Sequence, residues 1–398
     1  MPMLAFLPWL KLREPVRAGA FHAFTHVIDQ PLPADVPTGL MPETITKLLA
    51  QYRTAPHLPL RGLTILQYED RPLGDDLDEV ARAALFRFAG QLAVSGMGER
   101  RFIGDFPDDY TASGHYQLIV QAFSQPFSGA INLTHRRKGG HANVHMGQSE
   151  IQFFLPYYLV GQGTPTINKN LLEGFQQLDS LPELQRNDVD AAVTQYLLAN
   201  SDSPDVPPDA LSLSTYAALE RVSSSSQRLD DIQVKLPEIL SIVEGSPWTE
   251  EMRRELKLCA EDGQPVLHQW LNHMYQLRGQ VAHGKPVLNV PSGWSQQEHL
   301  IAGAFVFPLA LMCLMARHGA YSLRAEDVAH VIGLEMLLAG RPFYAQRTLA
   351  DEAEISVRER SGWLQQFQKI NNALFGVELT GSLFAAYDHV VGPEQGAS

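Results

Sequence analysis

The segment "YQLRGQVAHGKP", residues 275–286, brings an arginine and a histidine close together at the end of an apparent helix. An arginine side chain offers a fixed fork of N–H donors that can hold an anionic oxygen group. A histidine can take up and release protons near neutral pH. Arg278 and His283 therefore supply the residue types for proton transfer on an anionic substrate.

The helix that carries these residues is predicted to start at Pro265. Its apolar residues recur every three or four positions and form one stripe. These are Leu267, Leu271, Met274, Leu277 and Val281. At about 100° per residue, Arg278 falls on the same stripe, and a buried guanidinium needs a charge partner. His283 stands directly before Gly284, a typical helix stop, and Pro286 follows.

The pattern of an arginine, any four residues and a histidine is a weak signal by itself, because it recurs at Arg17/His22 and Arg136/His141. Those two pairs fall in a predicted strand and in a basic loop. The third pair ends an amphipathic helix punctuated by Gly and Pro, so its context carries the signal. A structural arginine paired with a neighbouring helix, followed by a capping histidine, remains the alternative.

The segment "MYQLRGQVAHGKP" resembles the signature of HEPN domains, most nearly the Apea-like branch. In that family a long helix ends in Arg, four residues, His and then Gly. The upstream segment "STYAALERVSSS" is similar to the earlier family helix whose acidic residue packs toward the arginine, and Glu220 takes this place. The resemblance covers about residues 180–320, and the opening "FLPWLKLREPVRAGAF" is similar to the β-rich start of some multidomain members.

The resemblance implies a helical bundle that dimerises and brings two Arg/His pairs into one cleft. It implies a metal-independent RNA endonuclease without a cofactor, of the kind found in toxin and antiphage defence systems. His283 would be the acid and base, Arg278 would hold the phosphate, and Glu220 would orient Arg278. The products would carry a 2′,3′-cyclic phosphate and a 5′-OH. The alternative is a catalytically silent HEPN module that binds RNA or protein.

One position departs from the family pattern. A polar residue, often Asn, usually follows the arginine, and here Gly279 does. The departure puts substrate positioning in doubt and leaves the silent module open. Glycine within a helix costs about 1 kcal/mol relative to alanine, so we expect a packing reason for Gly279.

Charge and composition limit the partners. The chain has 398 residues, a net charge of −13 and two cysteines, Cys259 and Cys313, which favours a reducing cytoplasm. Residues 176–320 contain 10 Lys/Arg and 18 Asp/Glu, a net of −8. A protein that coats long nucleic acid usually presents a basic face. An RNA substrate is therefore expected to be small and to enter a confined site.

Two apolar segments bear on membranes. "LIAGAFVFPLALMCLM", residues 300–315, has 16 residues and contains Pro308, fewer than the roughly 20 that span a bilayer. It predicts a buried central helix rather than a membrane span. The opening "MPMLAFLPWLKLREP" lacks a basic stretch and a small-residue cleavage site, which favours an opening strand over a signal peptide.

The fold class predicted is an α+β N-terminal domain followed by an all-α, HEPN-like bundle. Residues 1–165 hold several β-like runs and one helix, and are expected to sense a trigger, such as a phage-derived molecule, or to bind a protein partner. Residues 170–340 form the helical domain, and 341–398 a helical extension and tail. Pro237 is expected in the first turn of a short helix within "VKLPEILSIVEG".

The most basic stretch is "THRRKGGHANVHMG", residues 134–147. Its glycines and flanking strand patterns predict a hairpin. Arg136, Arg137 and Lys138 would then contact RNA phosphates, with a plain solvated turn as the alternative. His141 and His145 would share a metal only on a helix, and neither Cys nor carboxylate lies nearby, so we expect no metal site.

Overall fold

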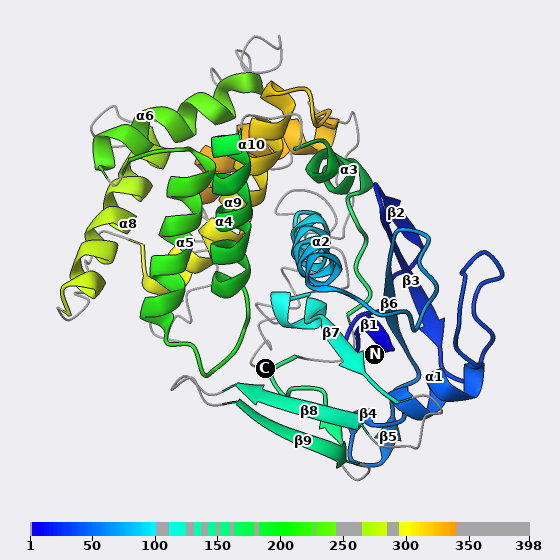
Figure 1. The fold of residues 1–398 in the computed structure, drawn as a ribbon. Helices are drawn as coiled ribbons and strands as arrows, with labels where there is room; N and C mark the ends of the chain where they lie inside the picture. Colours follow the sequence, from blue (N-terminus) through cyan, green and yellow to red (C-terminus); the bar gives the residue numbers. More distant parts are fainter. Residues whose placement is uncertain are drawn as a thin grey trace, which may run out of the picture. The chain divides into compact units, whose positions relative to one another are not determined.

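A computed structural model describes residues 2–339, except 101–110, 125–130, 137–141, 149–151, 160–162, 179–182, 227, 244–264 and 285–293. The described chain forms two compact units (Figure 1). The first holds residues 2–99, 111–178 and 200–205, and the second holds Arg100, 183–199 and 206–339. The first unit mixes sheets and helices and the second is helical, so the coarse fold class predicted is confirmed.

A five-stranded antiparallel sheet organises the first unit. Its strand order is β2-β3-β6-β1-β7, and its strands are β1 (Met3–Leu7), β2 (Val16–Ala18), β3 (Phe21–Val27), β6 (Gly62–Tyr68) and β7 (Ile119–Ala122). Ile65 on the central strand pairs with Phe24 on one side and Phe6 on the other. Runs of aromatic and branched residues predict β3, β6 and β7, and the opening segment is predicted as a strand rather than a signal peptide. The structure confirms these four strands.

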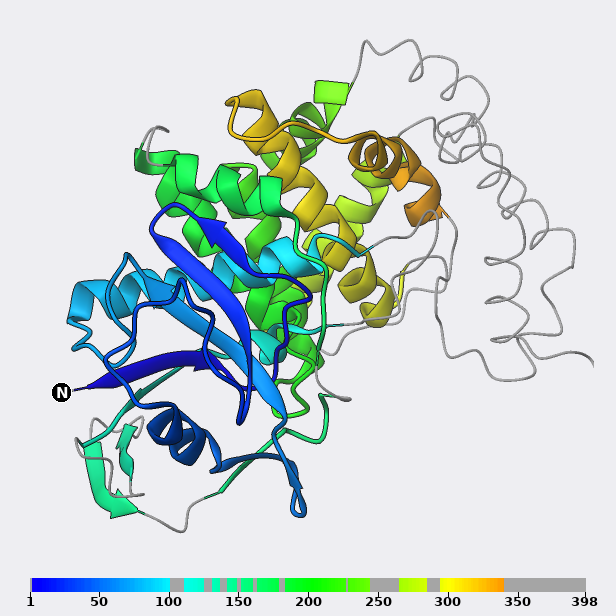
Figure 2. The ribbon, with the colours of Figure 1, turned by 90° about the vertical axis from the view of Figure 1, so that its right-hand side faces the viewer.

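A helix packs against each face of this sheet (Figures 1 and 2). Leu48 of α1 (Pro42–Leu49) belongs to a buried cluster with Phe6 and Ile65. On the other face, Phe88 of α2 (Glu79–Met97) stacks on Phe21 with centroids 4.4 Å apart. The side chain of Asp78 caps α2 by accepting from the N–H of Ala81. Cover on both faces explains why β6 is buried along most of its length.

Shorter elements complete the first unit. A three-stranded sheet has the order β10-β4-β5, with β4 (Tyr52–Ala55), β5 (Leu58–Pro59) and β10 (Phe153–Phe154). β8 (Ile131–Arg136) and β9 (Ala142–Gln148) pair antiparallel, which confirms the hairpin predicted from the glycines. The 3-10 turn η1 (Ser113–Tyr116) precedes β7. The first unit continues through α3 (Lys169–Gln177), because α3 packs on α2 and β2.

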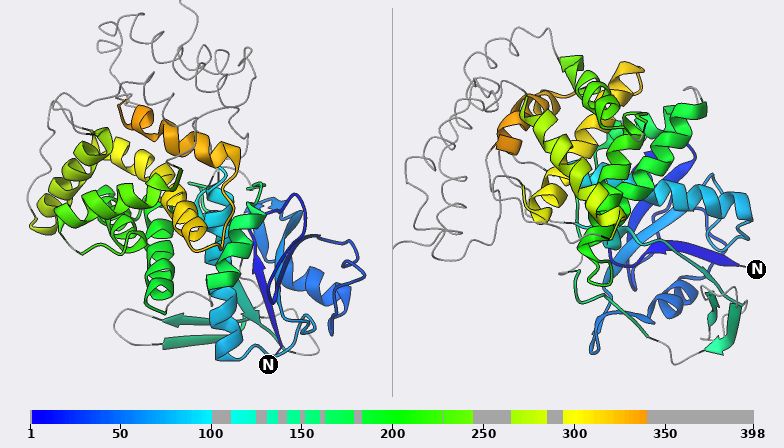
Figure 3. Two further views of the ribbon diagram at one scale, coloured as in Figure 1. Left: turned by 90° about the horizontal axis from the view of Figure 1, so that it is seen from above. Right: turned by 90° about the vertical axis from the view of Figure 1, so that its left-hand side faces the viewer.

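The second unit is built around α9, drawn in yellow in Figure 3. Its helices are α4 (Glu183–Ala199), α5 (Pro208–Val222), α6 (Leu229–Leu240), α8 (Val266–Ala282), α9 (Gln296–Arg317) and α10 (Ala325–Ala339), with a 3-10 turn η3 (Ser241–Val243). α9 contacts α4, α5, α6 and α10, while α8 contacts α5, α6 and α10. Helices 5 and 8 are therefore neighbours, which brings the two candidate site segments together.

In the described part of the chain, α9 alone is long and apolar enough to cross a membrane. However, 72% of its most apolar window is buried inside the protein. The prediction of a buried central helix is confirmed for this segment. The predicted tail, residues 341–398, lies outside the described residues.

Pro308 lies inside α9 and has no backbone N–H for the carbonyl of Ala304, four residues earlier. The hydroxyl of Tyr196 on α4 donates to that carbonyl at 3.1 Å. The Tyr196 ring also stacks on Phe307, with centroids 4.4 Å apart. A hydrogen bond from another helix thus satisfies the group that the proline leaves unpaired.

Pro237 is predicted in the first turn of its helix, but the structure places it near the end of that helix. The helix α6 begins at Leu229, and Pro237 stands three residues before its end. Asp230 and Asp231 occupy the first turn, where carboxylates are favoured by the helix dipole. These acidic residues lie ahead of the quoted apolar segment, so the helix starts earlier than the proline alone suggests.

Candidate functional site

Arg278 lies on the rim of the helical core. Leu267, Leu271, Met274 and Leu277 are all buried, as the stripe predicts, and Val281 is half-buried. The side chain of Arg278 is 27% exposed, so its guanidinium is neither in the core nor fully in water. A charge at this depth keeps part of its hydration and still responds strongly to neighbouring groups.

Glu220 on α5 is the charge partner of Arg278. One carboxylate oxygen, Oε1, lies 3.8 Å from Nη2 of Arg278, and the glutamate side chain is only 13% exposed. This distance allows an ion pair but is too long for a hydrogen bond. Oε1 is buried and has no hydrogen-bond partner among the described residues. The structure thus brings together the two residues that the sequence pairs.

Burial dominates the electrostatics of Glu220. Desolvation raises the pKa of its carboxyl, and the opposing charges of Arg278 and Arg221 offset only part of that effect. Burial also raises the pKa of Tyr216, one helical turn earlier on α5. The tyrosine hydroxyl has no hydrogen-bond partner among the described residues. Two buried oxygen groups on α5 therefore have little polar support among the described residues.

Two tyrosine rings contact Arg278. The guanidinium carbon lies 5.3 Å from the ring centroid of Tyr216 and 5.9 Å from that of Tyr275. Both distances fall within the range of cation–π attraction. The two rings lie 6.2 Å apart and are tilted by 57°. Arg278 makes no hydrogen bond to any residue that the structure describes, and its ion-pair and ring contacts there are with Glu220 and these two tyrosines.

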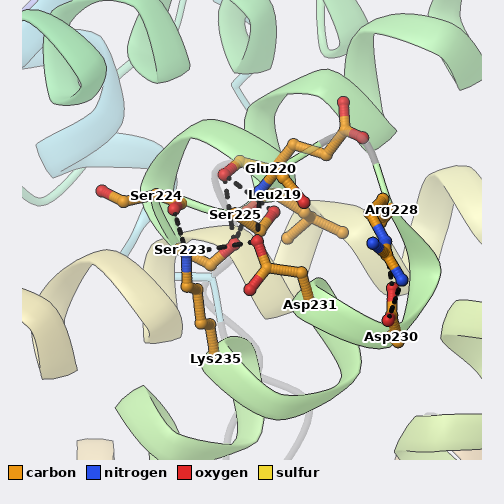
Figure 4. A network of polar contacts seen from close by, with 10 residues as sticks. Leu219, Glu220, Ser223, Ser224, Ser225, Arg228, Asp230, Asp231 and Lys235 are labelled. Atoms are coloured by element: carbon orange, nitrogen blue, oxygen red, sulfur yellow. Dashed lines mark hydrogen bonds and ion pairs between the residues drawn. The ribbon is translucent and has the colours of Figure 1, made fainter.

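The end of α5 that holds Glu220 is fixed by the serine run that follows it. Figure 4 shows the hydroxyls of Ser223 and Ser225 directed at the backbone carbonyl of Glu220, at 3.1 and 3.2 Å. The backbone N–H of Ser225 donates to the same carbonyl at 2.9 Å. Lys235 of α6 donates to the carbonyl of Ser224 at 2.7 Å. These contacts hold the helix end and so limit the positions that Glu220 can take.

His283 is the C-cap residue of α8 and is exposed. Its backbone N–H donates to the carbonyl of Gly279 at 3.2 Å, and Gly284 adopts a left-handed φ of +63° as the predicted stop. The imidazole makes no hydrogen bond, ion pair or ring contact in the described part of the chain. Its ring is therefore available to a ligand or a partner.

The next helix ends in the same way. His318 caps α9, is exposed, and is followed by Gly319 at φ +73°. Capping alone therefore accounts for a histidine before glycine at both helix ends. What distinguishes the end of α8 is the cluster of Arg278, Glu220 and the two tyrosines one turn earlier.

The packing reason expected for Gly279 is absent among the described residues. A Cβ built on Gly279 would meet nothing within 4 Å. Gly303 of α9 shows the opposite case, because a Cβ there would lie 2.2 Å from Cγ2 of Thr215 on α5. Close helix packing thus requires glycine at position 303 and leaves position 279 open.

A second histidine pair, missed in the sequence, lies on α8 and α9. Nδ1 of His273 is 2.7 Å from Nε2 of His299, and the rings stack with centroids 5.0 Å apart. Burial, and then the nearby His273, lower the pKa of His299 to about 3. His299 is therefore neutral at physiological pH. The ring centroid of the buried Trp270 lies 6.0 Å from that of His299.

The basic hairpin is described only in part. Arg136 ends β8, whereas Arg137, Lys138 and His141 lie outside the described residues. His145 lies on β9, in a strand and not on the helix that a shared metal site would need. Within the described ranges, no group of three or more His, Cys, Asp or Glu residues could hold a metal ion.

No known protein family model matches the chain, and no curated protein or solved structure is significantly similar to it. The residues around Arg278 must therefore be interpreted from their own chemistry. Tyr216 lies four residues before Glu220, and Tyr275 lies three residues before Arg278. That spacing puts each tyrosine on the face of its helix that carries the charged residue, which is the signal that could have found them.

Proposed function

We propose that this protein is a metal-independent endoribonuclease of the HEPN type. One observation carries the proposal. Arg278 is half-buried on α8 and held by charge and ring contacts, yet its N–H donors make no hydrogen bond to a described residue. A guanidinium so placed can offer two parallel donors to a phosphate. The exposed His283 follows on the same helix and can act as acid and base.

The chemistry follows from these two groups. His283 removes the proton of a ribose 2′-OH, and the 2′-oxygen attacks the adjacent phosphorus. Arg278 stabilises the charge that develops on the phosphate oxygens. A histidine in its protonated form gives a proton to the departing 5′-oxygen. The products are a 2′,3′-cyclic phosphate and a 5′-OH end, and no cofactor enters the scheme.

Helix geometry supports a dimeric site. Five residues along a helix correspond to about 140° of rotation and about 7.5 Å of rise, so Arg278 and His283 of one chain point in different directions. Two copies related by a two-fold axis can place the histidine of one chain beside the arginine of the other. We therefore propose a homodimer that forms the site at the ends of its two α8 helices.

The first unit would carry the control. We propose that its sheet domain recognises a protein or phage-derived trigger, that Arg136, Arg137 and Lys138 contact RNA, and that the protein works in the cytoplasm in toxin or antiphage defence. The acidic charge of residues 176–320 favours a small RNA target that enters a confined site over long RNA.

A second candidate is a HEPN-like module that binds without cutting. The open space beside Gly279 favours it, because no polar side chain stands next to Arg278 to position a substrate. Incubation of the purified protein with RNA in chelator, followed by analysis of the new ends, separates the two functions. Cyclic phosphate and 5′-OH ends support the nuclease. Binding of RNA without cleavage supports the module.

A further inference from the structure

We infer that Tyr216 and Tyr275 are positioning residues whose ring faces pack against the Arg278 guanidinium and leave its N–H donors free for an anion. The inference rests on the proposed function for its catalytic consequence, but the ring contacts can be tested without it. The two rings come from α5 and α8, so their contacts with Arg278 also join these neighbouring helices.

The first argument is geometric. Glu220 lies 3.8 Å from Nη2 of Arg278 and makes no hydrogen bond to it, so the carboxylate alone does not fix the direction of the guanidinium. The ring centroids lie 5.3 and 5.9 Å from the guanidinium carbon and approach it from two helices. Contact with the faces of two tilted rings restricts a flat cation more than one distant charge does.

The second argument concerns hydrogen bonds. A carboxylate that bound Arg278 through two hydrogen bonds would occupy donors that the phosphate needs. Ring faces attract the cation without using any N–H group. Arg278 thus keeps its charge at a half-buried site while its fork of donors stays unoccupied among the described residues. The tyrosines position the guanidinium, and the arginine binds the substrate.

The third argument is the hydroxyl of Tyr216. Tyr216 is fully buried, and its hydroxyl has no hydrogen-bond partner among the described residues. An unpaired buried hydroxyl opposes folding, so the hydroxyl does not explain why position 216 carries a tyrosine. The aromatic ring is the part of Tyr216 with a defined neighbour at this site. Phenylalanine at position 216 should therefore keep the ring contact with Arg278, and leucine should lose it.

The test compares Tyr275→Leu, Tyr275→Phe, Tyr216→Leu and Tyr216→Phe with Tyr157→Leu as the matched control. Tyr157 is 85% exposed and belongs to the first unit, far in sequence from Arg278. The activity-independent readout is the NMR signal of the Arg278 side-chain Nε–H, which we expect the ring currents of the two tyrosines to shift upfield. We expect the leucine variants to lose part of this shift, the phenylalanine variants to keep it, and the control to leave it unchanged.

The second readout is cleavage of a short single-stranded RNA of mixed sequence. The leucine variants should lower kcat/KM by about 2- to 30-fold, the range that one cation–π contact represents, and phenylalanine should restore it. If Tyr216→Leu does not fold, Tyr275→Leu decides, because Tyr275 is only half-buried. An unchanged Arg278 signal in Tyr275→Leu overturns the inference that the tyrosine rings position Arg278. If the wild-type protein shows the upfield shift but no cleavage, the ring contacts with Arg278 are supported and the nuclease function is refuted.

Discussion

Nη2 of Arg278 lies 3.8 Å from Oε1 of Glu220, close enough for charge attraction and too far for a hydrogen bond. The pair joins α5 to α8 at the edge of the helical core. The glutamate is the more deeply buried partner, and its pKa is raised because burial outweighs the attraction. The arrangement holds a cation at a helix end without saturating its donors.

Removal of Arg278 should therefore cost stability as well as activity. Arg278→Ala leaves the buried carboxylate of Glu220 without its closest opposing charge. A double-mutant cycle with Glu220→Gln, measured by urea unfolding, should give a coupling free energy of about 0.5–1 kcal/mol, because the pair is loose and partly exposed. Additive effects of the two substitutions would show that the side chains do not interact.

Acid should destabilise the helical unit through His299. The folded-state pKa of His299 is lowered to about 3, below its ordinary value in the unfolded chain. The contribution of neutral His299 is complete above about pH 6.5 and is lost as the pH falls from there toward 3, by about 1.4 kcal/mol per pH unit. Tryptophan fluorescence during urea unfolding can follow this, because Trp270 and Trp294 lie near His299.

The variant His299→Gln removes the titrating group and should flatten this part of the pH dependence. His318→Gln is the control, because His318 is exposed at the end of the same helix. A pH dependence of His299→Gln equal to that of the wild type would mean that His299 is not buried in its neutral form.

Two glycines of the helical unit should respond in opposite ways to alanine. Gly303→Ala puts a Cβ 2.2 Å from Cγ2 of Thr215 and should destabilise the fold by about 1–3 kcal/mol. Gly279→Ala meets nothing within 4 Å inside a helix and should stabilise it by up to about 1 kcal/mol. Thermal unfolding of both variants gives the sign of each effect. A loss of stability in Gly279→Ala would reveal a neighbour beyond the described residues.

Local spacing predicts part of this fold and misses the rest for physical reasons. The stripe through Leu271 and Met274 predicts α8, because that helix buries one periodic face. The continuous apolar run around Pro308 predicts α9, because that helix is buried on most sides. The helix α1 is not predicted, because its eight residues are too few to show a sustained helical period, although Ile45, Leu48 and Leu49 follow helical spacing. One of the β-like runs expected in residues 1–165 gives only the two-residue strand Phe153–Phe154.

The candidate site shows the same limit. The pairing of Glu220 with Arg278 could be predicted, because a charge on an apolar stripe requires a partner. The contact of His273 with His299 could not, since the residues are 26 positions apart and meet only when α8 and α9 pack. Tyr216 and Tyr275 lay within reach of a spacing argument, but their role depends on the tertiary distance to Arg278.

The proposed site requires two copies of the chain. We expect a two-fold dimer whose axis passes near the ends of the α8 helices and which buries at least about 1,000 Å². Ala282→Cys, exposed beside His283, should form a disulfide across the axis, whereas Val234→Cys on α6, 64% exposed, should not. Light scattering that reports only a monomer, with and without RNA, would favour the binding module.

The central claim is that His283 performs proton transfer in RNA cleavage without a metal. The direct measurement is the cleavage rate of a single-stranded RNA in excess chelator by the wild type, His283→Ala and His318→Ala. Each histidine caps its helix through its backbone N–H, which alanine keeps, so both variants should fold. We predict cleavage by the wild type and His318→Ala and none by His283→Ala. Equal cleavage by all three proteins would contradict the claim.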